Sequence, residues 1–220
     1  EALGLPRQFP GVGPENVLGI ELNAYAAELA RVSVWIGEIQ WMRRNGFDAS
    51  RNPVLRTLDT IECRDAVLNA DVSQAAWPKA DVVVGNPPFL GNSKMLAELG
   101  EDYTLALRKA WPQVPGSVDL VCYWFAKAWD MMVAGKLHRA GLVATNSIRG
   151  GASRDVLKPI AEHGRIFEAW SDEPWTVDGA AVRVSMVCFD REHGATARID
   201  GVVVEVVHAD LTGAGIGTRS

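Results

Sequence analysis

The chain has 220 residues, of which 48% are hydrophobic and 22% charged, a composition typical of one globular domain with a hydrophobic core. Its formal net charge of −5 argues against DNA or RNA binding through a general excess of basic side chains. Either the partner is not a nucleic acid or a basic recognition surface lies outside this chain, and we favour the second interpretation.

No apolar run is long enough to span a bilayer, and the first residues lack a signal-peptide pattern. Cys63, Cys122 and Cys188 are scattered, without the CxxC spacing or histidine partners of a zinc site. We therefore expect a cytoplasmic protein with reduced thiols, no membrane contact and no metal.

The first half of the chain alternates apolar runs with one long helical pattern. Asn23 is a suitable N-cap for the helix, and Asn45-Gly46 is a suitable end. The predicted elements are a strand at 17–22, a helix at 24–42, and strands at 60–64 and 81–85. The continuous apolar core of the last strand predicts that both of its faces are covered.

The second half continues the alternation. The predicted elements are helices at 103–111, 118–134 and 153–163, and strands at 141–146, 165–171, 181–190 and 202–208. Pro159 is expected to kink or shorten the helix that contains it. The segments 180–189 and 202–208 are expected to pair as an antiparallel hairpin at the C-terminal edge.

This order predicts an α/β fold, a Rossmann-like doubly wound sheet that is mostly parallel and has an antiparallel C-terminal edge hairpin. Ligands of such folds bind at the carboxyl ends of the strands. Three predicted strand ends carry polar side chains, at Glu21, Asp65 and Asn86.

Glu21 and Asp65 are each open to two interpretations. An acid at the position of Glu21 can accept hydrogen bonds from both hydroxyls of a ribose, as in dinucleotide-binding folds. It can equally be a helix-capping or solvated acid, and alone that is the better interpretation. Asp65 is either an ordinary turn acid or an acceptor for the amino group of an adenine.

The sequence Asn86-Pro87-Pro88-Phe89 follows the 81–85 strand directly. Prolines lack an N–H and fix φ, so the loop is stiff and offers carbonyl acceptors without competing donors. The Asn86 side-chain oxygen and the Pro87 carbonyl could accept both hydrogens of an exocyclic amine and localise its lone pair. Phe89 could stack on an extruded base. A strand-terminating turn alone would also explain Asn-Pro.

Together these residues resemble the adenine-N6 DNA methyltransferases of the class I S-adenosylmethionine-dependent fold. The similarity extends to the MmeI-like (type IIL) restriction-modification enzymes, which combine restriction, methylation and DNA recognition in one polypeptide. The segments that carry the resemblance are 17–41, 81–95, 119–128, 140–152 and 169–189.

The resemblance implies a role for each matching position. Glu21 would bind the ribose of S-adenosylmethionine, Leu22 would pack on its adenine, Asp65 would accept from its amino group, and Ala66 would line that pocket. Asn86, Pro87, Pro88 and Phe89 would perform the transfer. The segment 119–125 would start the helix beside the cofactor pocket.

Further positions are implied for double-stranded DNA. Asn146 and Ser147 would end a strand near the target base, and Arg149 and Arg154 could touch phosphate, although surface arginines are often merely solvated. Trp175, in a proline-containing loop, could give the second stacking face for the extruded adenine. A core tryptophan is the competing interpretation.

The resemblance also implies how the chain is divided. Residues 1–16 would be a linker or partial helix, 17–210 an incomplete catalytic domain, and 211–220 a linker towards a target recognition domain. The family's glycine-rich cofactor loop and its strand are expected before residue 17 and are not found there. We therefore expect the isolated chain to be inactive, and the nuclease and recognition domains to belong to the same parent polypeptide.

Three classes of alternative remain at this point. Protein-glutamine and RNA-adenine methyltransferases use similar Asn-Pro-Pro loops, although the former generally carry Tyr where Phe89 stands. A nicotinamide-dependent dehydrogenase would use Glu21 but leaves the Asn86 loop unexplained and lacks the glycine fingerprint. A non-catalytic DNA-docking remnant would keep the fold alone.

Overall fold

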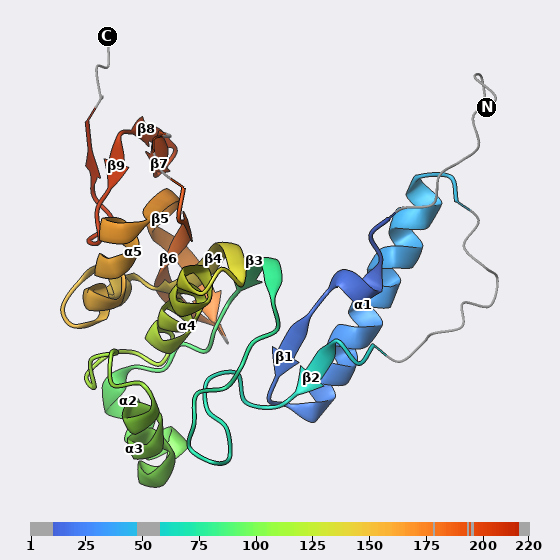
Figure 1. Ribbon diagram of the computed structural model, residues 1–220, viewed down its shortest axis with the longest axis horizontal. Helices are drawn as coiled ribbons and strands as arrows, with labels where there is room; N and C mark the ends of the chain where they lie inside the picture. The colour runs from blue at the N-terminus through green and yellow to red at the C-terminus, as the bar shows by residue number, and fades with distance from the viewer. Residues whose placement is uncertain (1–10, 48–57, 178, 193, 195, 216–220) are drawn as a thin grey trace. The chain divides into compact units, whose positions relative to one another are not determined.

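The computed structural model describes residues 11–47, 58–177, 179–192, 194 and 196–215 (Figure 1). The chain forms two compact units, residues 1–66 and residues 67–220, and each is described by itself. Parts of the expected linkers, at 1–10 and 216–220, lie outside the described residues. No described helix has the length and apolar character needed to cross a membrane.

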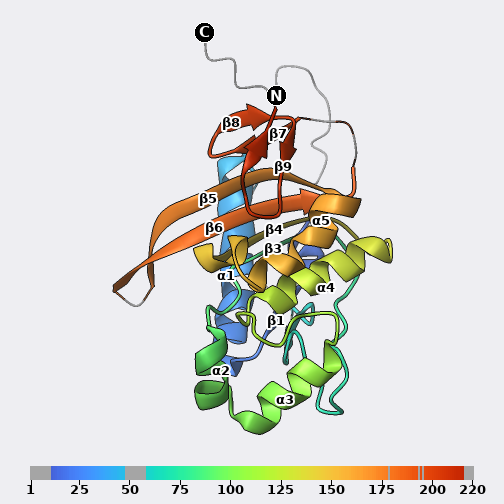
Figure 2. The same cartoon turned by 90° about the vertical axis from the view of Figure 1, so that its left-hand side faces the viewer.

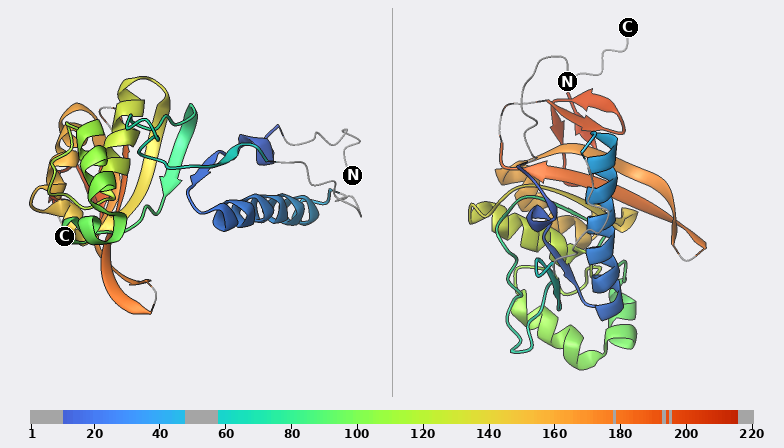
Figure 3. Two further views of the ribbon diagram at one scale, coloured as in Figure 1. Left: turned by 90° about the horizontal axis from the view of Figure 1, so that it is seen from below. Right: turned by 90° about the vertical axis from the view of Figure 1, so that its right-hand side faces the viewer.

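The first unit is a helix packed on a two-stranded parallel sheet. Its elements are η1 (Pro14–Asn16), β1 (Gly19–Glu21), α1 (Ala24–Arg44) and β2 (Ile61–Cys63). The helix α1 runs along β1 and β2 (Figures 1 and 3), and Ala27, Leu58 and Ile61 are buried between them. The predicted N-cap is confirmed, because the Asn23 side chain accepts hydrogen bonds from the Tyr25 and Ala26 amides.

The second unit contains the larger sheet. Its helical elements are α2 (Asn92–Leu99), α3 (Glu101–Ala110), α4 (Cys122–Val133), η2 (Asn146–Arg149), η3 (Ser153–Val156) and α5 (Lys158–His163). Its strands are β3 (Ala80–Gly85), β4 (Leu137–Thr145), β5 (Arg165–Val177), β6 (Ala180–Asp190), β7 (Ala197–Ile199), β8 (Val202–Val204), β9 (Val206–Val207) and β10 (Gly213–Ala214). The main sheet has the order β3-β4-β6-β5-β7-β8.

The strand pairing confirms a mixed α/β fold with antiparallel strands towards the C-terminus. The pairs β1–β2, β3–β4 and β5–β7 are parallel, and β4–β6, β5–β6 and β7–β8 are antiparallel. The predicted pairing of 180–189 with 202–208 is wrong. Instead β6 lies between β4 and β5, and β8 pairs with β7, whose three residues are too short to give a sequence pattern.

The helix boundaries differ from the sequence prediction at several points. The helix α2 was not predicted, and α4 begins at Cys122 instead of at residue 118. Pro159 does shorten its helix as expected. It stands in the first turn of α5, and the preceding residues form the separate 3-10 helix η3.

The core of the second unit lies between the main sheet and two helices on one of its faces. Figures 1 and 2 show α4 and α5 on the same face, and the stacked rings of Phe125 and Phe189 join α4 to β6 at 5.9 Å between centroids. The buried Trp111 donates a hydrogen bond from Nε1 to the Val67 carbonyl at 3.0 Å. The one polar atom of its side chain therefore has a hydrogen-bond partner.

The strand β3 is one of the two edge strands of the main sheet. Val82 and Val84 are 56% and 81% exposed, so the described residues of the second unit leave this face of the strand uncovered. Apolar continuity predicted a strand with both faces covered, but such a pattern does not distinguish a central position in the sheet from an edge.

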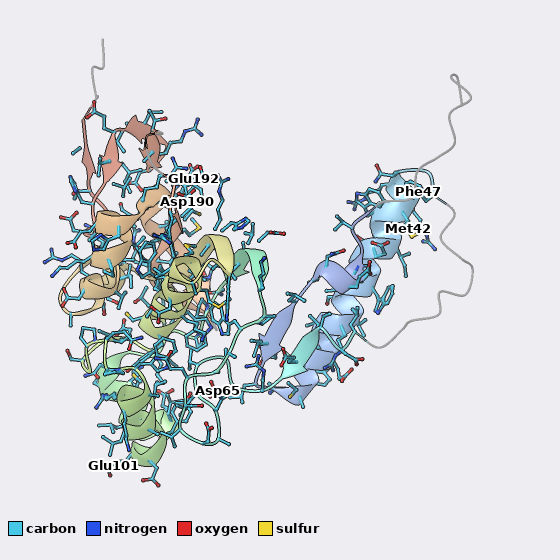
Figure 4. The ribbon with its side chains drawn as sticks, in the orientation of Figure 1. Met42, Phe47, Asp65, Glu101, Asp190 and Glu192 are labelled. Carbon is cyan, nitrogen blue, oxygen red and sulfur yellow. The ribbon has the colours of Figure 1, made fainter. Side chains whose placement is uncertain are left out.

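A buried carboxylate joins β5 and β6, two central strands of the main sheet. Asp190 is 1% exposed and accepts hydrogen bonds from Nε and Nη2 of Arg165 at 2.8 and 3.0 Å. Glu192, which lies beside it in Figure 4, takes the second bond of the same Nη2 at 2.9 Å. This pairing compensates the buried charge and fixes the start of β5 against the end of β6.

Gly164, between α5 and β5, is a packing constraint. A Cβ here would lie 2.5 Å from the Asp190 backbone oxygen and 2.9 Å from the Trp129 ring. Replacement Gly164→Ala should therefore lower the free energy of unfolding by about 1–3 kcal/mol, measured by urea denaturation. Gly150→Ala, with nothing within 4 Å of the added Cβ, is the matched control. Equal stability of the two variants would contradict the clash.

Candidate functional site

The segment Asn86–Phe89 lies at the carboxyl end of β3, as the sequence predicts. The strand runs parallel to β4 with Gly85 opposite Leu142, so the loop begins beside the last residues of β4. The polar segments that begin at Asn86 and at Asn146, 60 residues apart in the chain, thereby both lie at one edge of the sheet, at the carboxyl ends of neighbouring strands. This is the edge at which α/β folds bind ligands.

The loop combines an exposed polar side chain with an anchored backbone. Asn86 and Pro88 are exposed, Pro87 is buried and Phe89 is half-buried. Directly after Phe89, the carbonyl of Leu90 accepts the amide of Leu120 at 2.9 Å. The loop is thus stiffened by its prolines and held at its far end by the turn before α4.

Polar side chains also gather at the carboxyl end of β4. One carboxylate oxygen of Asp119, Oδ2, accepts hydrogen bonds from Ser147 Oγ at 2.5 Å and from Thr145 Oγ1 at 3.1 Å. The two hydroxyl oxygens are themselves 2.6 Å apart. The spacing along the chain, 26 and 28 residues, gives no sequence signal for this contact.

Asn146 lies between those two hydroxyl residues in the chain, and a different carboxylate, that of Asp172, binds its side chain. Its Nδ2 donates to Asp172 Oδ1 at 3.1 Å, and Arg183 Nε donates to the same oxygen at 2.8 Å. The Arg183 guanidinium lowers the pKa of the Asp172 carboxyl below its ordinary value of 3.8, and Asn146 adds to this effect. The carboxylate is therefore charged at neutral pH and fixes the Asn146 amide.

The two candidate arginines lie in the short helices that follow. Arg149, at the end of η2, is exposed, and its Nη1 lies 3.5 Å from the Ser171 carbonyl. Arg154, in η3, is half-buried, and its Nε has no hydrogen-bond partner among the described residues. Both stand close in sequence to the polar end of β4.

Trp175 lies in β5 opposite Val182 of β6, so its expected place in a loop is wrong. The register of the β5–β6 pair shifts between Trp170 and Glu173, and the pairing then continues through Pro174, which lies opposite Arg183. Figures 2 and 3 show this antiparallel pair extending beyond the neighbouring strands. Trp175 is 43% exposed, which argues against the alternative of a core tryptophan.

The expected cofactor residues lie together in the first unit. Glu21 ends β1 opposite Cys63 of β2, and Asp65 follows two residues later, labelled in Figure 4. One oxygen of Glu21, Oε1, accepts the Asn23 amide at 2.8 Å, so the acid does contribute to the turn before α1.

This edge has the chemistry that a nucleoside requires. Leu22 is 70% exposed and offers an apolar surface beside the carboxylate of Glu21, while Asp65 and Ala66 are half-buried. A carboxylate suits ribose hydroxyls, and an exposed leucine suits the face of a base. The residues present therefore fit such a ligand. They belong to residues 1–66, whereas Asn86–Phe89 belong to residues 67–220.

We compared the chain with known proteins. The family model of the MmeI DNA-methyltransferase domain matches residues 7–199. DNA methyltransferase A of Bacillus subtilis (strain 168) is 28% identical over 166 residues, which are 71% of this chain and 18% of that protein. The solved structure of the type IIL restriction-modification enzyme MmeI in complex with DNA matches with a TM-score of 0.70 at 22% identity.

The MmeI match covers 92% of this chain and 29% of the MmeI chain. At this identity it shows a shared fold, which confirms the predicted α/β architecture. The chain spans less than a third of the length of either relative.

The thiols beside the site give a direct test of the described packing. Burial raises the pKa of Cys122, at the start of α4, to about 12, whereas Cys63 is exposed. At pH 8 iodoacetamide should therefore label Cys63 first. At this pH the reactive thiolate form of Cys122 is about 10⁴-fold less populated than its thiol form. Peptide mapping by mass spectrometry, with Cys63→Ser as control, measures this. Labelling of Cys122 at the rate of Cys63 would contradict the burial.

Proposed function

Because the chain belongs to the MmeI DNA-methyltransferase domain family, we propose that it is the catalytic region of a site-specific adenine-N6 DNA methyltransferase. The parent protein would act in a restriction-modification system. The observation that carries the proposal is the stiff Asn86–Phe89 loop at the carboxyl end of β3, with Asn86 exposed. The loop has the acceptors that an exocyclic amine requires.

The chemical problem is the low nucleophilicity of the adenine amine, whose lone pair is delocalised into the ring. The Asn86 Oδ1 and the Pro87 carbonyl would each accept one hydrogen of this amine. Two acceptors in fixed positions draw the nitrogen towards tetrahedral geometry and stabilise the positive charge that develops on it. Pro87 is buried, and the stiffness of the two-proline loop would hold its carbonyl in place before the substrate arrives.

The target adenine must leave the DNA helix before its amine can reach Asn86. Phe89 would stack on one face of the extruded base. Trp175, exposed on the extended β5–β6 pair, would supply the second face. Asn146 and Ser147 would lie near the same base, since the β4 end at which they stand is adjacent to the loop.

S-adenosylmethionine, when bound, supplies the electrophilic methyl group. Glu21 would bind its ribose hydroxyls, Leu22 would pack on its adenine, and Asp65 would accept from the adenine amino group, with Ala66 beside it. The placement of Glu21 and Asp65 after neighbouring parallel strands supports this assignment. The exposed Leu22 supports it as well.

Double-stranded DNA is the proposed macromolecular partner. Arg149 and Arg154 would contact phosphates near the catalytic loop, but the net charge of −5 requires further basic surface in the parent polypeptide. We assign that surface to a target recognition domain after residue 210, and propose a nuclease in the same polypeptide. Residues 17–210 would form the methyltransferase domain, acting in the cytoplasm.

Replacing Asn86 by Ala in the full polypeptide should lower kcat for plasmid methylation by about 10²–10³-fold, because one fixed acceptor of the amine is lost. Tritium transfer from labelled S-adenosylmethionine measures the rate. Asn45→Ala, at the end of α1, is the matched control and should keep wild-type kcat. If Asn86→Ala had the same kcat as the wild type, the role of Asn86 as an acceptor for the adenine amine would be contradicted.

Replacing Glu21 by Ala should raise KM for S-adenosylmethionine by about 10- to 100-fold with little change in kcat, because hydrogen bonds from ribose to a charged acceptor are lost. Steady-state kinetics at saturating DNA give both constants. Glu162→Ala, an exposed acid of α5, is the control. An unchanged KM in Glu21→Ala would show that this carboxylate serves only the turn before α1.

A further inference from the structure

Asp119 stands in the turn before α4, where it connects two segments of the second unit. Its Oδ2 accepts hydrogen bonds from Ser147 and Thr145, both at the carboxyl end of β4. An ionised carboxylate only accepts, and its hydrogen bonds are shorter and stronger than those of neutral groups. The carboxylate thereby fixes its turn to β4.

The same turn also holds the far end of the Asn86–Phe89 loop. The amide of Leu120, the residue after Asp119, donates to the Leu90 carbonyl at 2.9 Å. Gly91 lies so close that a Cβ on it would be 3.6 Å from Asp119 Oδ1. The loop therefore ends against Asp119 and its neighbour.

The turn itself has little room to move. The Cys122 amide donates to the Asp119 carbonyl at 3.0 Å, and Leu120, Val121 and Cys122 are at most 5% exposed. The apolar side chains hold the turn in the core, while the carboxylate directs it towards the β4 end. Of these four residues, only Asp119 connects the buried turn to the polar side chains at the carboxyl end of β4.

We propose that Asp119 is a positioning residue for methyl transfer, an inference that rests on the proposed function of the loop. The near end of the loop is fixed by the register of β3 with β4, and the far end by Leu120. Asp119 sets the distance between these two points by binding Thr145 and Ser147. It acts on the geometry of Asn86 and Pro87 and does not itself contact the amine.

The expected kinetic signature is a change in kcat. Because a displacement of about 1 Å can cost 10²-fold in rate, Asp119→Ala should lower kcat by about 10²-fold and leave KM for S-adenosylmethionine and DNA within about twofold. Asp119→Asn keeps one acceptor oxygen and should restore part of the loss. Asp155→Ala, which removes an acid paired with Lys158 on the surface, is the matched control.

The coupling to β4 can be tested by a double-mutant cycle. If Asp119 acts through the hydroxyls, Thr145→Val should lower kcat by about tenfold alone, and adding it to Asp119→Ala should cause no further loss. Thr145→Val keeps the size of the side chain. Its kcat alone therefore tests the proposal even if Asp119→Ala does not fold. Full additivity of the two substitutions would overturn the proposed coupling.

A second readout is independent of methyl transfer. Hydrogen exchange of the Leu120 amide, which reports its bond to Leu90, should become at least tenfold faster in Asp119→Ala, whereas the Leu107 and Phe125 amides within α3 and α4 should not change. If the wild type transfers no methyl group to DNA, the proposed function fails and this exchange rate alone tests the positioning role. Wild-type kcat or wild-type exchange in Asp119→Ala would overturn the proposal.

Discussion

The parallel register of β3 with β4 is the constraint on which the candidate site depends. Pairing Gly85 with Leu142 brings Asn86 to the edge of the sheet at which Thr145 ends β4. The two strands are far apart in the chain, so no local property of either segment could produce this proximity. A loop of two prolines needs such a frame, because its stiffness is useful only when both of its ends are fixed.

Around that frame, charged groups connect the segments that follow the strands. Asp119 binds the hydroxyls on either side of Asn146, and Asp172 binds Asn146 itself together with Arg183. Near the amino end of β4, Asp190 of β6 binds Arg165 of β5 and so connects these two strands. Each carboxylate connects two segments by hydrogen bonds, in addition to the apolar packing around them.

Much of this could be predicted from the sequence. Asn23, Asn45-Gly46 and Pro159 marked helix boundaries through local chemistry, and the Asn86 loop was recognisable because its residue types match the task that we propose for it. The edge position of β3 and the partners of β6 could not be predicted, since register and strand order depend on contacts far apart in the chain. The hydrogen bonds of Asp119 and Asp172 could not be predicted for the same reason.

We propose that this loop directs a methyl group to the N6 amine of adenine in DNA. The most direct test is to digest plasmid DNA methylated by the full polypeptide and identify the modified nucleoside by mass spectrometry. We predict that the modified nucleoside is N6-methyldeoxyadenosine. Methylation of cytosine instead, or of protein or RNA but not DNA, would contradict the account.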